Sequence, residues 1–444
     1  LFTDISSELS KISDQMVMEY VRQSNYFDKK GEIALKGSLP KDWQGYVPDC
    51  YFNFDSQGFD INPFTKQYTG WRAFQYYPFL GTFWPTNGST DDVLIRLPAE
   101  FRQDENGKFN LDIYRTNLAI LEVLVKQKDT VFDETFDEKL AGIDLNNDGK
   151  LTHTNTIKFR PDLPYAGMAG KLLKERKIYL EPGLFPQGTE FLHTVRYINW
   201  DDKNNIPKLS PRIKEVRYAY KEEWFSSMEL QSMLWRKMEE RHPSKSTNPE
   251  PQLEAFAGDF EKGMKNIFGW RYSGFIEDKN GNLRPQTNEE TTYCMGCHDT
   301  IGATTDSTFS FVRKFSWGYW KETGLKGIPE PVVEYKKFGK VGEYSFYLKN
   351  NKSANEFRNN QEVIEKFFNP DGSLKQDMVE KLKTDISVLL YPSKERAIHL
   401  NKSYMVMVKR QGYIFGREQI GNLEKVVHKE LEKDKKTGII DTVY

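Results

Sequence analysis

The sequence predicts an α+β fold with three parts: irregular, aromatic-rich loops, a mainly antiparallel β region, and a helical C-terminal part. Residues 190–200 and 212–220 alternate between apolar and polar side chains, as two paired strands do. The stretch 37–87 is rich in glycine, proline and aromatic residues and has no helical period. The helical part is indicated by apolar residues at helical spacing in 362–368, 375–390 and 393–411.

Composition excludes several classes of protein. The formal net charge of −1 shows no overall bias toward nucleic acid or an anionic membrane. Mean hydropathy is −0.69, and no run of 18 apolar residues occurs, so we expect no transmembrane segment.

Local patterns predict further elements of the first half. Residues 6–26 have helical spacing, 92–97 has the pattern of a strand, and 114–125 is a strongly apolar helix. Between the last two, 104–107 reads Asp-Glu-Asn-Gly, which is typical of a turn.

In the second half, residues 226–242 read as a helix, with Ser226 and Glu229 placed to form a capping box. Residues 275–283 read as a hairpin and 309–315 as a strand. The charged tail 425–436 is expected to be solvated.

The most specific motif is Cys294-Met295-Gly296-Cys297-His298, which has the C-x-x-C-H spacing of covalent haem attachment. In such sites both thiols become thioethers of the porphyrin, and the histidine that follows binds the iron. We therefore expect Cys294 and Cys297 to hold one c-type haem, with His298 as an iron ligand and the three parts of the fold arranged around it. A zinc site lacks a second ligand pair, and a redox dithiol lacks a buried strand before it.

The second iron ligand is less clear from the sequence. His193 lies on the predicted strand 190–200 between apolar neighbours, where a buried imidazole needs a partner. We choose His193 as the distal ligand, and the alternative is a core histidine with an ordinary hydrogen-bond partner. Met264 and Cys50 are the next candidates.

A second metal motif lies at residues 144–151, which match the first eight positions of an EF-hand calcium loop. Asp144, Asn146 and Asp148 would supply side-chain oxygens and Lys150 its backbone carbonyl. Position 12 of the loop is Asn155 rather than glutamate, which weakens the match. The alternative is a metal-free turn rich in Asp and Asn.

At 444 residues, the length suggests roughly two to three domains. We divide the chain into an N-terminal aromatic-rich and calcium-loop region (1–155), a β-rich haem-bearing region (156–325) and a helical C-terminal region (326–444).

The third cysteine, Cys50, lies outside the C-x-x-C-H motif. Cys50 is left without a partner in the chain if the other two cysteines hold a haem. Three roles are open for it: a buried apolar residue, a reactive thiol or iron ligand, or half of an intermolecular disulfide.

Because bacteria attach haem to protein outside the cytoplasm and the sequence begins at Leu1, we expect an exported protein whose signal peptide was removed, in the periplasm or at the cell surface.

The motif at 294–298 resembles c-type cytochromes. The segments 83–97, 188–197 and 291–302 resemble exported bacterial mono-haem proteins, a group of no established activity. This resemblance implies an extracytoplasmic c-type cytochrome that transfers electrons to a redox partner protein, which could be another cytochrome. The alternative is a haem-dependent oxidoreductase acting on peroxide or a sulfur species at an open iron position.

Overall fold

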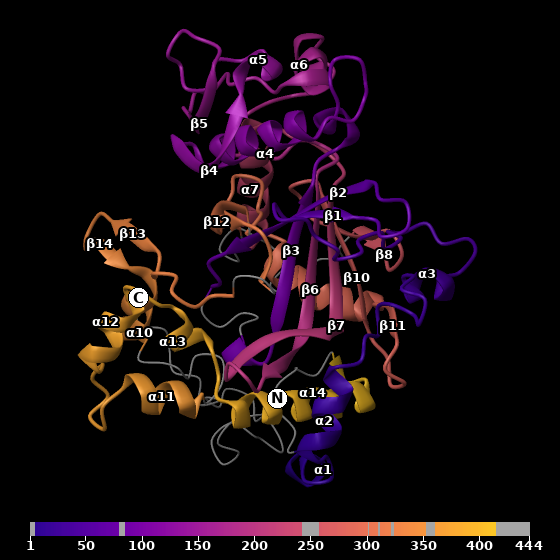
Figure 1. Cartoon of the computed structure of the whole chain (residues 1–444), viewed down its shortest axis with the longest axis vertical. Coiled ribbons are helices and arrows are strands. Elements are labelled where there is room, and N and C mark those ends of the chain that lie inside the picture. The colour runs from indigo at the N-terminus through magenta and orange to yellow at the C-terminus, as the bar shows by residue number, and fades with distance from the viewer. Residues whose placement is uncertain are drawn as a thin grey trace.

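A computed structural model describes residues 5–79, 85–241, 257–300, 302–309, 311–320, 324–351 and 360–413. Its centre is a large antiparallel sheet, visible in Figure 1 as the long strands in the middle of the molecule. Helices and small hairpins lie around it, so the prediction of an α+β fold with a mainly antiparallel β region is confirmed. Within the described residues, no helix is both long and apolar enough to span a membrane.

The sheet has ten strands, and eight of them follow the order β1-β2-β3-β6-β7-β10-β9-β8. Two short strands join outside this order, β11 next to β10 and β12 next to β2. In chain order the strands are β1 (Phe59–Ile61), β2 (Tyr68–Tyr76), β3 (Thr90–Arg96), β6 (Glu190–Asp201), β7 (Ile206–Lys221), β8 (Ala257–Asp259), β9 (Gly263–Lys265), β10 (Trp270–Glu277), β11 (Leu283–Pro285) and β12 (Lys314–Trp317).

Several sequence predictions hold in this sheet, and one fails. The strands expected at 190–200 and 212–220 pair as β6 and β7, and the hairpin expected at 275–283 is β10–β11. The expectation of irregular structure throughout 37–87 is wrong, because β2 is a nine-residue strand whose side chains are mostly buried on both faces. A strand buried on both faces does not alternate between apolar and polar residues, so its sequence lacks the two-residue period that identifies a strand.

The pairing register of the sheet determines which side chains lie together at its centre. Val93 of β3 pairs with His193 of β6, and His193 pairs with Arg217 of β7. Arg217 pairs in turn with Gly274 of β10. Residues paired in this way point to the same face of an antiparallel sheet, so His193 and Arg217 share one face at its centre.

That face packs against α4 (Leu111–Lys126), whose N-cap Asn110 accepts hydrogen bonds from the backbone of Asp112 and Ile113. Twelve of its sixteen residues are buried, so other parts of the protein cover it on nearly all sides. Around it lie β4 (Thr130–Asp137), α5 (Glu138–Ala141), β5 (His153–Ile157) and α6 (Gly167–Lys174), which form the upper end of the molecule in Figure 1.

The opposite face and the lower end carry helices from both ends of the chain. The expected helix 6–26 is two helices, α1 (Ser6–Leu9) and α2 (Asp14–Val21), because Ser13 caps a new start by accepting from Met16 N. Both pack against α14 (Lys394–Arg410). The buried amide of Asn401 fixes α14 to β6 with two hydrogen bonds to the backbone of Ile198.

The C-terminal part contains the three expected helical segments, one of them divided, together with a helix and a hairpin that were not expected. The segments expected at 362–368 and 393–411 are α11 (Gln361–Phe367) and α14, and the segment expected at 375–390 is two helices, α12 (Gln376–Leu382) and α13 (Ser387–Leu390). The additional helix is α10 (Glu343–Asn351). The hairpin pairs β13 (Val332–Tyr335) with β14 (Gly339–Gly342) and protrudes at the left in Figure 1. The charged tail 425–436 lies outside the described residues. The three-domain division stays a prediction, and the large sheet takes strands from both 1–155 and 156–325.

Other expected elements are present with shifted bounds. The helix expected at 226–242 is α7 (Ser227–Arg241), and the capping box forms, since Glu229 accepts from the backbone of Ser226. The strand expected at 309–315 is a short 3₁₀ helix, Phe311–Arg313, followed by β12.

One type of turn occurs four times among the described residues. It starts at Asp28, Asp55, Asp104 and Asp278, and each time reads Asp-x-x-Gly. In every copy, Oδ1 of the aspartate accepts from the backbone N–H groups two and four residues on. The glycine has φ between +80° and +87°, which non-glycine residues rarely adopt. The predicted turn at 104–107 is therefore one member of a set.

Candidate functional site

The predicted C-x-x-C-H motif lies on α8 (Asn288–His298). Thr287 and Glu290 form a capping box at its start: Glu290 N donates to the Thr287 hydroxyl, and Thr287 N donates to the Glu290 carboxylate. Arg284 holds the same carboxylate with two hydrogen bonds of 2.9 Å. Cys294 is half-buried and free, and His298 is the last residue of the helix.

His298 lies against β10 of the large sheet. Its ring lies 4.7 Å from that of Tyr272 on β10 and 5.5 Å from that of Phe309. Burial lowers the pKa of His298 from 6.5 to about 3, with smaller electrostatic contributions from Arg217 and His193. The imidazole is therefore neutral at physiological pH, the form that accepts hydrogen bonds and binds metals.

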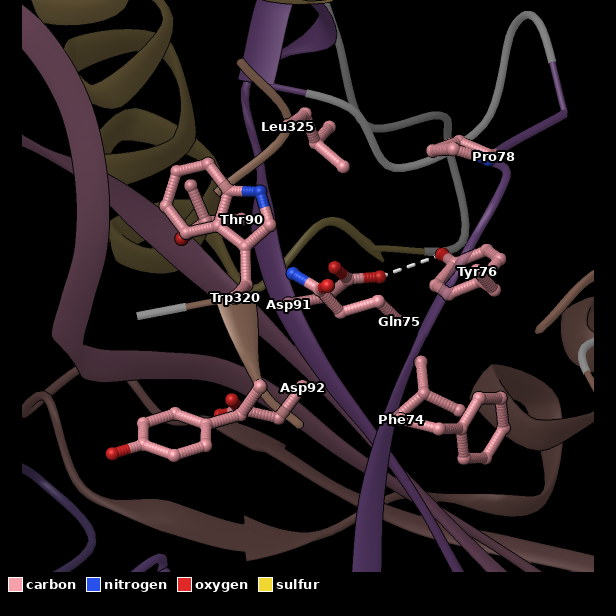
Figure 2. Close-up of a pocket in the computed structure, with 11 residues that line it drawn as sticks. Phe74, Gln75, Tyr76, Pro78, Thr90, Asp91, Asp92, Trp320 and Leu325 are labelled. Carbon is pink, nitrogen blue, oxygen red and sulfur yellow. Dashed lines mark hydrogen bonds between the residues drawn. The ribbon is translucent and has the colours of Figure 1, made fainter. Parts of the chain in front are cut away.

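His193 is the other predicted iron ligand, and the structure brings it near His298. The two come from elements a hundred residues apart, yet His193 is close enough to lower the pKa of His298, and both lie toward the sheet face that carries Arg217. Nε2 of His193 lies 3.0 Å from Oδ2 of Asp91. Tyr76 donates to the same oxygen at 2.6 Å, a contact drawn in Figure 2. These contacts make Tyr76, Asp91 and His193 one hydrogen-bonded chain across three strands.

Met264 and Cys50 were the other candidate iron ligands. Met264 lies close to the C-x-x-C-H helix, and Cys50 does not. Met264 on β9 is buried, and its sulfur lies 3.5 Å from the hydroxyl of Thr292 on α8. Cys50 belongs to the apolar cluster on the other face of the sheet and has no exposed surface. Burial raises the pKa of its thiol well above the ordinary value, with Asp60 adding to the effect. Cys50 is thus a protonated core residue.

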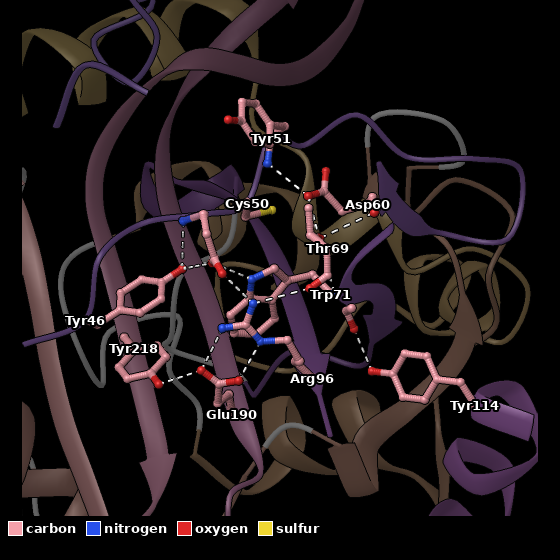
Figure 3. A network of polar contacts seen from close by, with 12 residues as sticks. Tyr46, Cys50, Tyr51, Asp60, Thr69, Trp71, Arg96, Tyr114, Glu190 and Tyr218 are labelled. Carbon is pink, nitrogen blue, oxygen red and sulfur yellow. Dashed lines mark hydrogen bonds and ion pairs between the residues drawn. The ribbon is translucent and has the colours of Figure 1, made fainter. Parts of the chain in front are cut away.

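Figure 3 shows what surrounds Cys50. Arg96 lies between two carboxylates, with Glu190 bound to two of its nitrogens and Asp49 to a third. Tyr218 donates to Glu190, and the indole of Trp71 donates to Asp49. Because these side chains satisfy one another's hydrogen bonds and charges, the network holds the segment around Asp49 against the sheet.

Asp91 also lines a small pocket at the β2–β3 side of the sheet (Figure 2). Its walls are Phe74, Gln75, Tyr76, Pro78, Thr90, Asp91, Asp92, Val93, Tyr319, Trp320 and Leu325. The lining includes four aromatic rings and two carboxylates but no lysine or arginine. Sequence reasoning missed this pocket because its walls come from segments more than 200 residues apart.

One polar atom of this lining is unsatisfied. Oδ2 of Asp92 accepts from Arg196 at 2.9 Å and faces the Thr194 hydroxyl at 3.3 Å. Oδ1 of Asp92 is buried and has no hydrogen-bond partner among the described residues. Burial raises the pKa of Asp92, while Arg196 opposes that shift. An orphaned buried acceptor costs free energy unless something donates to it.

The predicted calcium loop exists as a compact turn on the upper end of the molecule. Asp144, Asn146 and Asp148 accept hydrogen bonds from backbone N–H groups inside the loop. The buried carboxylate of Glu138 on α5 accepts from the N–H groups of Leu145, Asn146 and Thr152. Asn155, the twelfth position, is exposed on β5 and bonded to Thr156. Calcium binding stays a prediction.

Comparison with known proteins gives a different relationship from the one expected. The sequence matches the model of a lipoprotein family over residues 34–385. An uncharacterized lipoprotein of Aquifex aeolicus (strain VF5) is 33% identical over 448 residues, covering 91% of this chain and 72% of the relative. No solved structure matches.

These findings correct the functional prediction. The identification as a c-type cytochrome is wrong, since the family and the relative are lipoproteins. Electron transfer and the haem-dependent oxidation of peroxide or sulfur species are wrong with it, and the expected redox partner has no support. Within the described residues, no group of three or more His, Cys, Asp or Glu side chains could hold a metal ion.

The structure does not test whether Cys294 and Cys297 carry a covalent group. That part stays a prediction from their spacing, which the mass of the exported protein decides. What is established is that the chain belongs to a family of lipoproteins, exported proteins held at a membrane by a covalently attached lipid.

Proposed function

We propose that this chain is the extracytoplasmic part of a lipid-anchored protein, in the periplasm or at the cell surface, and that it binds a small amine in the pocket of Figure 2. Membership of a lipoprotein family supports this location. The ligand class follows from the lining of the pocket.

The observation that carries the proposal is Oδ1 of Asp92. It is a buried carboxylate oxygen with no donor among the described residues, in a residue that lines a pocket. An ammonium group is a compact cation with up to three N–H donors and would satisfy that oxygen. Asp91 adds a second carboxylate to the same lining.

The aromatic walls support the same class of ligand. Phe74, Tyr319 and Trp320 contribute rings, and the faces of such rings attract cations. The pocket is small, with room for one group about the size of an ammonium ion. We therefore expect the head group of a primary amine to enter it while the rest of the ligand stays outside.

Calorimetric titration with methylammonium tests the proposal, with methanol as the neutral ligand of similar shape. We expect heat of binding from methylammonium alone. Asp92→Asn should weaken that binding by about tenfold or more, the effect typical of losing a hydrogen bond to a charged group. Trp320→Leu should weaken it without removing a charge.

The control is Asp162→Asn, since Asp162 is a highly exposed aspartate far from the lining residues in sequence. Circular dichroism establishes that each variant is folded. Equal responses to methylammonium and methanol, or unchanged affinity in both folded pocket variants, would overturn the proposal.

A further inference from the structure

The β13–β14 hairpin carries an unusual combination of exposed side chains. Val332, Tyr335 and Phe338 are 67%, 41% and 51% exposed. Lys336, Lys337 and Lys340 are exposed between and beside them. Every residue from 334 to 340 is exposed, so the whole tip faces away from the protein.

The tip is held in shape rather than loose. Four residue pairs join its strands, from Val332 opposite Gly342 to Tyr335 opposite Gly339. The rings of Tyr335 and Phe338 lie 5.0 Å and 5.1 Å from the ring of Phe346 on α10. This packing holds both aromatic side chains in place at the tip.

The charge of the tip is opposite to that of the chain as a whole. Three lysines and one acidic residue, Glu334, lie within 332–342, a local excess of two positive charges on a protein of net charge −1. Lysines attract anionic lipid head groups, and aromatic side chains prefer the boundary between head groups and acyl chains.

We propose that this hairpin tip contacts an anionic phospholipid surface. The family to which the chain belongs is held at a membrane by lipid, so the surface is always within reach. Tethering raises the effective concentration of a second, weak contact. The tip would thus fix which side of the protein faces the membrane, and this inference does not depend on the amine pocket.

Co-sedimentation of the chain with vesicles tests the proposal. We compare phosphatidylglycerol–phosphatidylcholine vesicles with pure phosphatidylcholine. Binding should favour the anionic vesicles and fall as salt is raised. Lys336→Gln with Lys337→Gln should reduce it by about 30-fold, since each lysine near such a surface contributes roughly fivefold. Phe338→Ser should reduce it by about tenfold.

The chain offers matched controls in another turn. Lys29 and Lys30 are also consecutive exposed lysines in a turn, and Phe64 is a half-exposed ring near Gly31, which follows them. Lys29→Gln with Lys30→Gln, and Phe64→Ser, should leave vesicle binding unchanged. Equal loss in hairpin and control variants would overturn the proposal, as would no preference for anionic vesicles. Self-association of the soluble chain that Phe338→Ser abolishes would also overturn it, by making the tip a protein interface.

Discussion

The ammonium group of Lys221 lies 2.8 Å from Oδ2 of Asp306, and neither side chain has any exposed surface. Lys221 ends β7 and also donates to the carbonyl of Phe268. Asp306 follows α8 in the chain, and its Oδ2 also accepts from Phe185 N. The pair therefore ties the segment after His298 to the sheet, and sequence reasoning assigned neither residue a role.

We predict that Lys221→Met lowers the free energy of unfolding by about 3–5 kcal/mol, because it leaves the Asp306 carboxylate buried and unpaired. Lys221→Met combined with Asp306→Leu should lose less than the single variant. Urea denaturation measures both. The control is Lys394→Met, whose partner Asp202 is exposed, and it should cost far less than Lys221→Met because water screens the exposed pair. Equal losses at the buried and exposed pairs would contradict the prediction.

The lowered pKa of His298 predicts a pH dependence of stability. Its folded-state pKa is about 3, mainly through burial, whereas an unfolded histidine titrates near 6.5. Between these values the unfolded chain binds a proton that the folded chain does not, so His298 makes the protein less stable as pH falls from about 6.5 toward 3. His298→Gln should flatten that part of the stability profile.

The measurement is the urea midpoint of each protein at a series of pH values. His153→Gln is the control, since the side chain of His153 is 73% exposed. If the wild-type and His298→Gln profiles run parallel from pH 7 to pH 4, His298 does not titrate as the structure indicates.

The sequence predicted local structure well where a pattern repeats within one element. The alternation of β6 and β7 and the apolar run of α4 were both visible in it. It could not show β2 as a strand, because a strand buried on both faces lacks alternation.

The candidate site was also predicted only where local sequence carries the signal. His193 was selected as a buried imidazole that needs a partner, and it has one in Asp91. The pocket beside Asp91 depends on Trp320 meeting β2 and β3, a contact between distant segments that no local spacing encodes. The C-x-x-C-H spacing is local and specific, yet together with three short segments that resemble mono-haem proteins it led to the wrong family, because such motifs describe a few residues and not the rest of the chain.

For the loop at 144–152 we predict two separable effects on stability. One comes from the hydrogen bonds of Glu138, and the other would come from bound calcium. Glu138 is completely buried and accepts three backbone N–H groups of this loop, at 2.7, 3.3 and 2.8 Å. Glu138→Gln replaces one acceptor oxygen with a donor, so we expect a loss of about 2–3 kcal/mol in urea denaturation. That loss should be the same with calcium or with a chelator.

Calcium should act through Asp144 and Asp148 instead. If the loop binds the ion, calcium raises the thermal midpoint of the wild-type protein, because a ligand that binds only the folded state stabilises it. Asp144→Asn removes a carboxylate at the first loop position and should abolish that increase. Asp104→Asn, in one of the four Asp-x-x-Gly turns, should preserve it. A midpoint that is identical in calcium and in chelator would assign the loop to the metal-free turns, with Glu138 alone holding it.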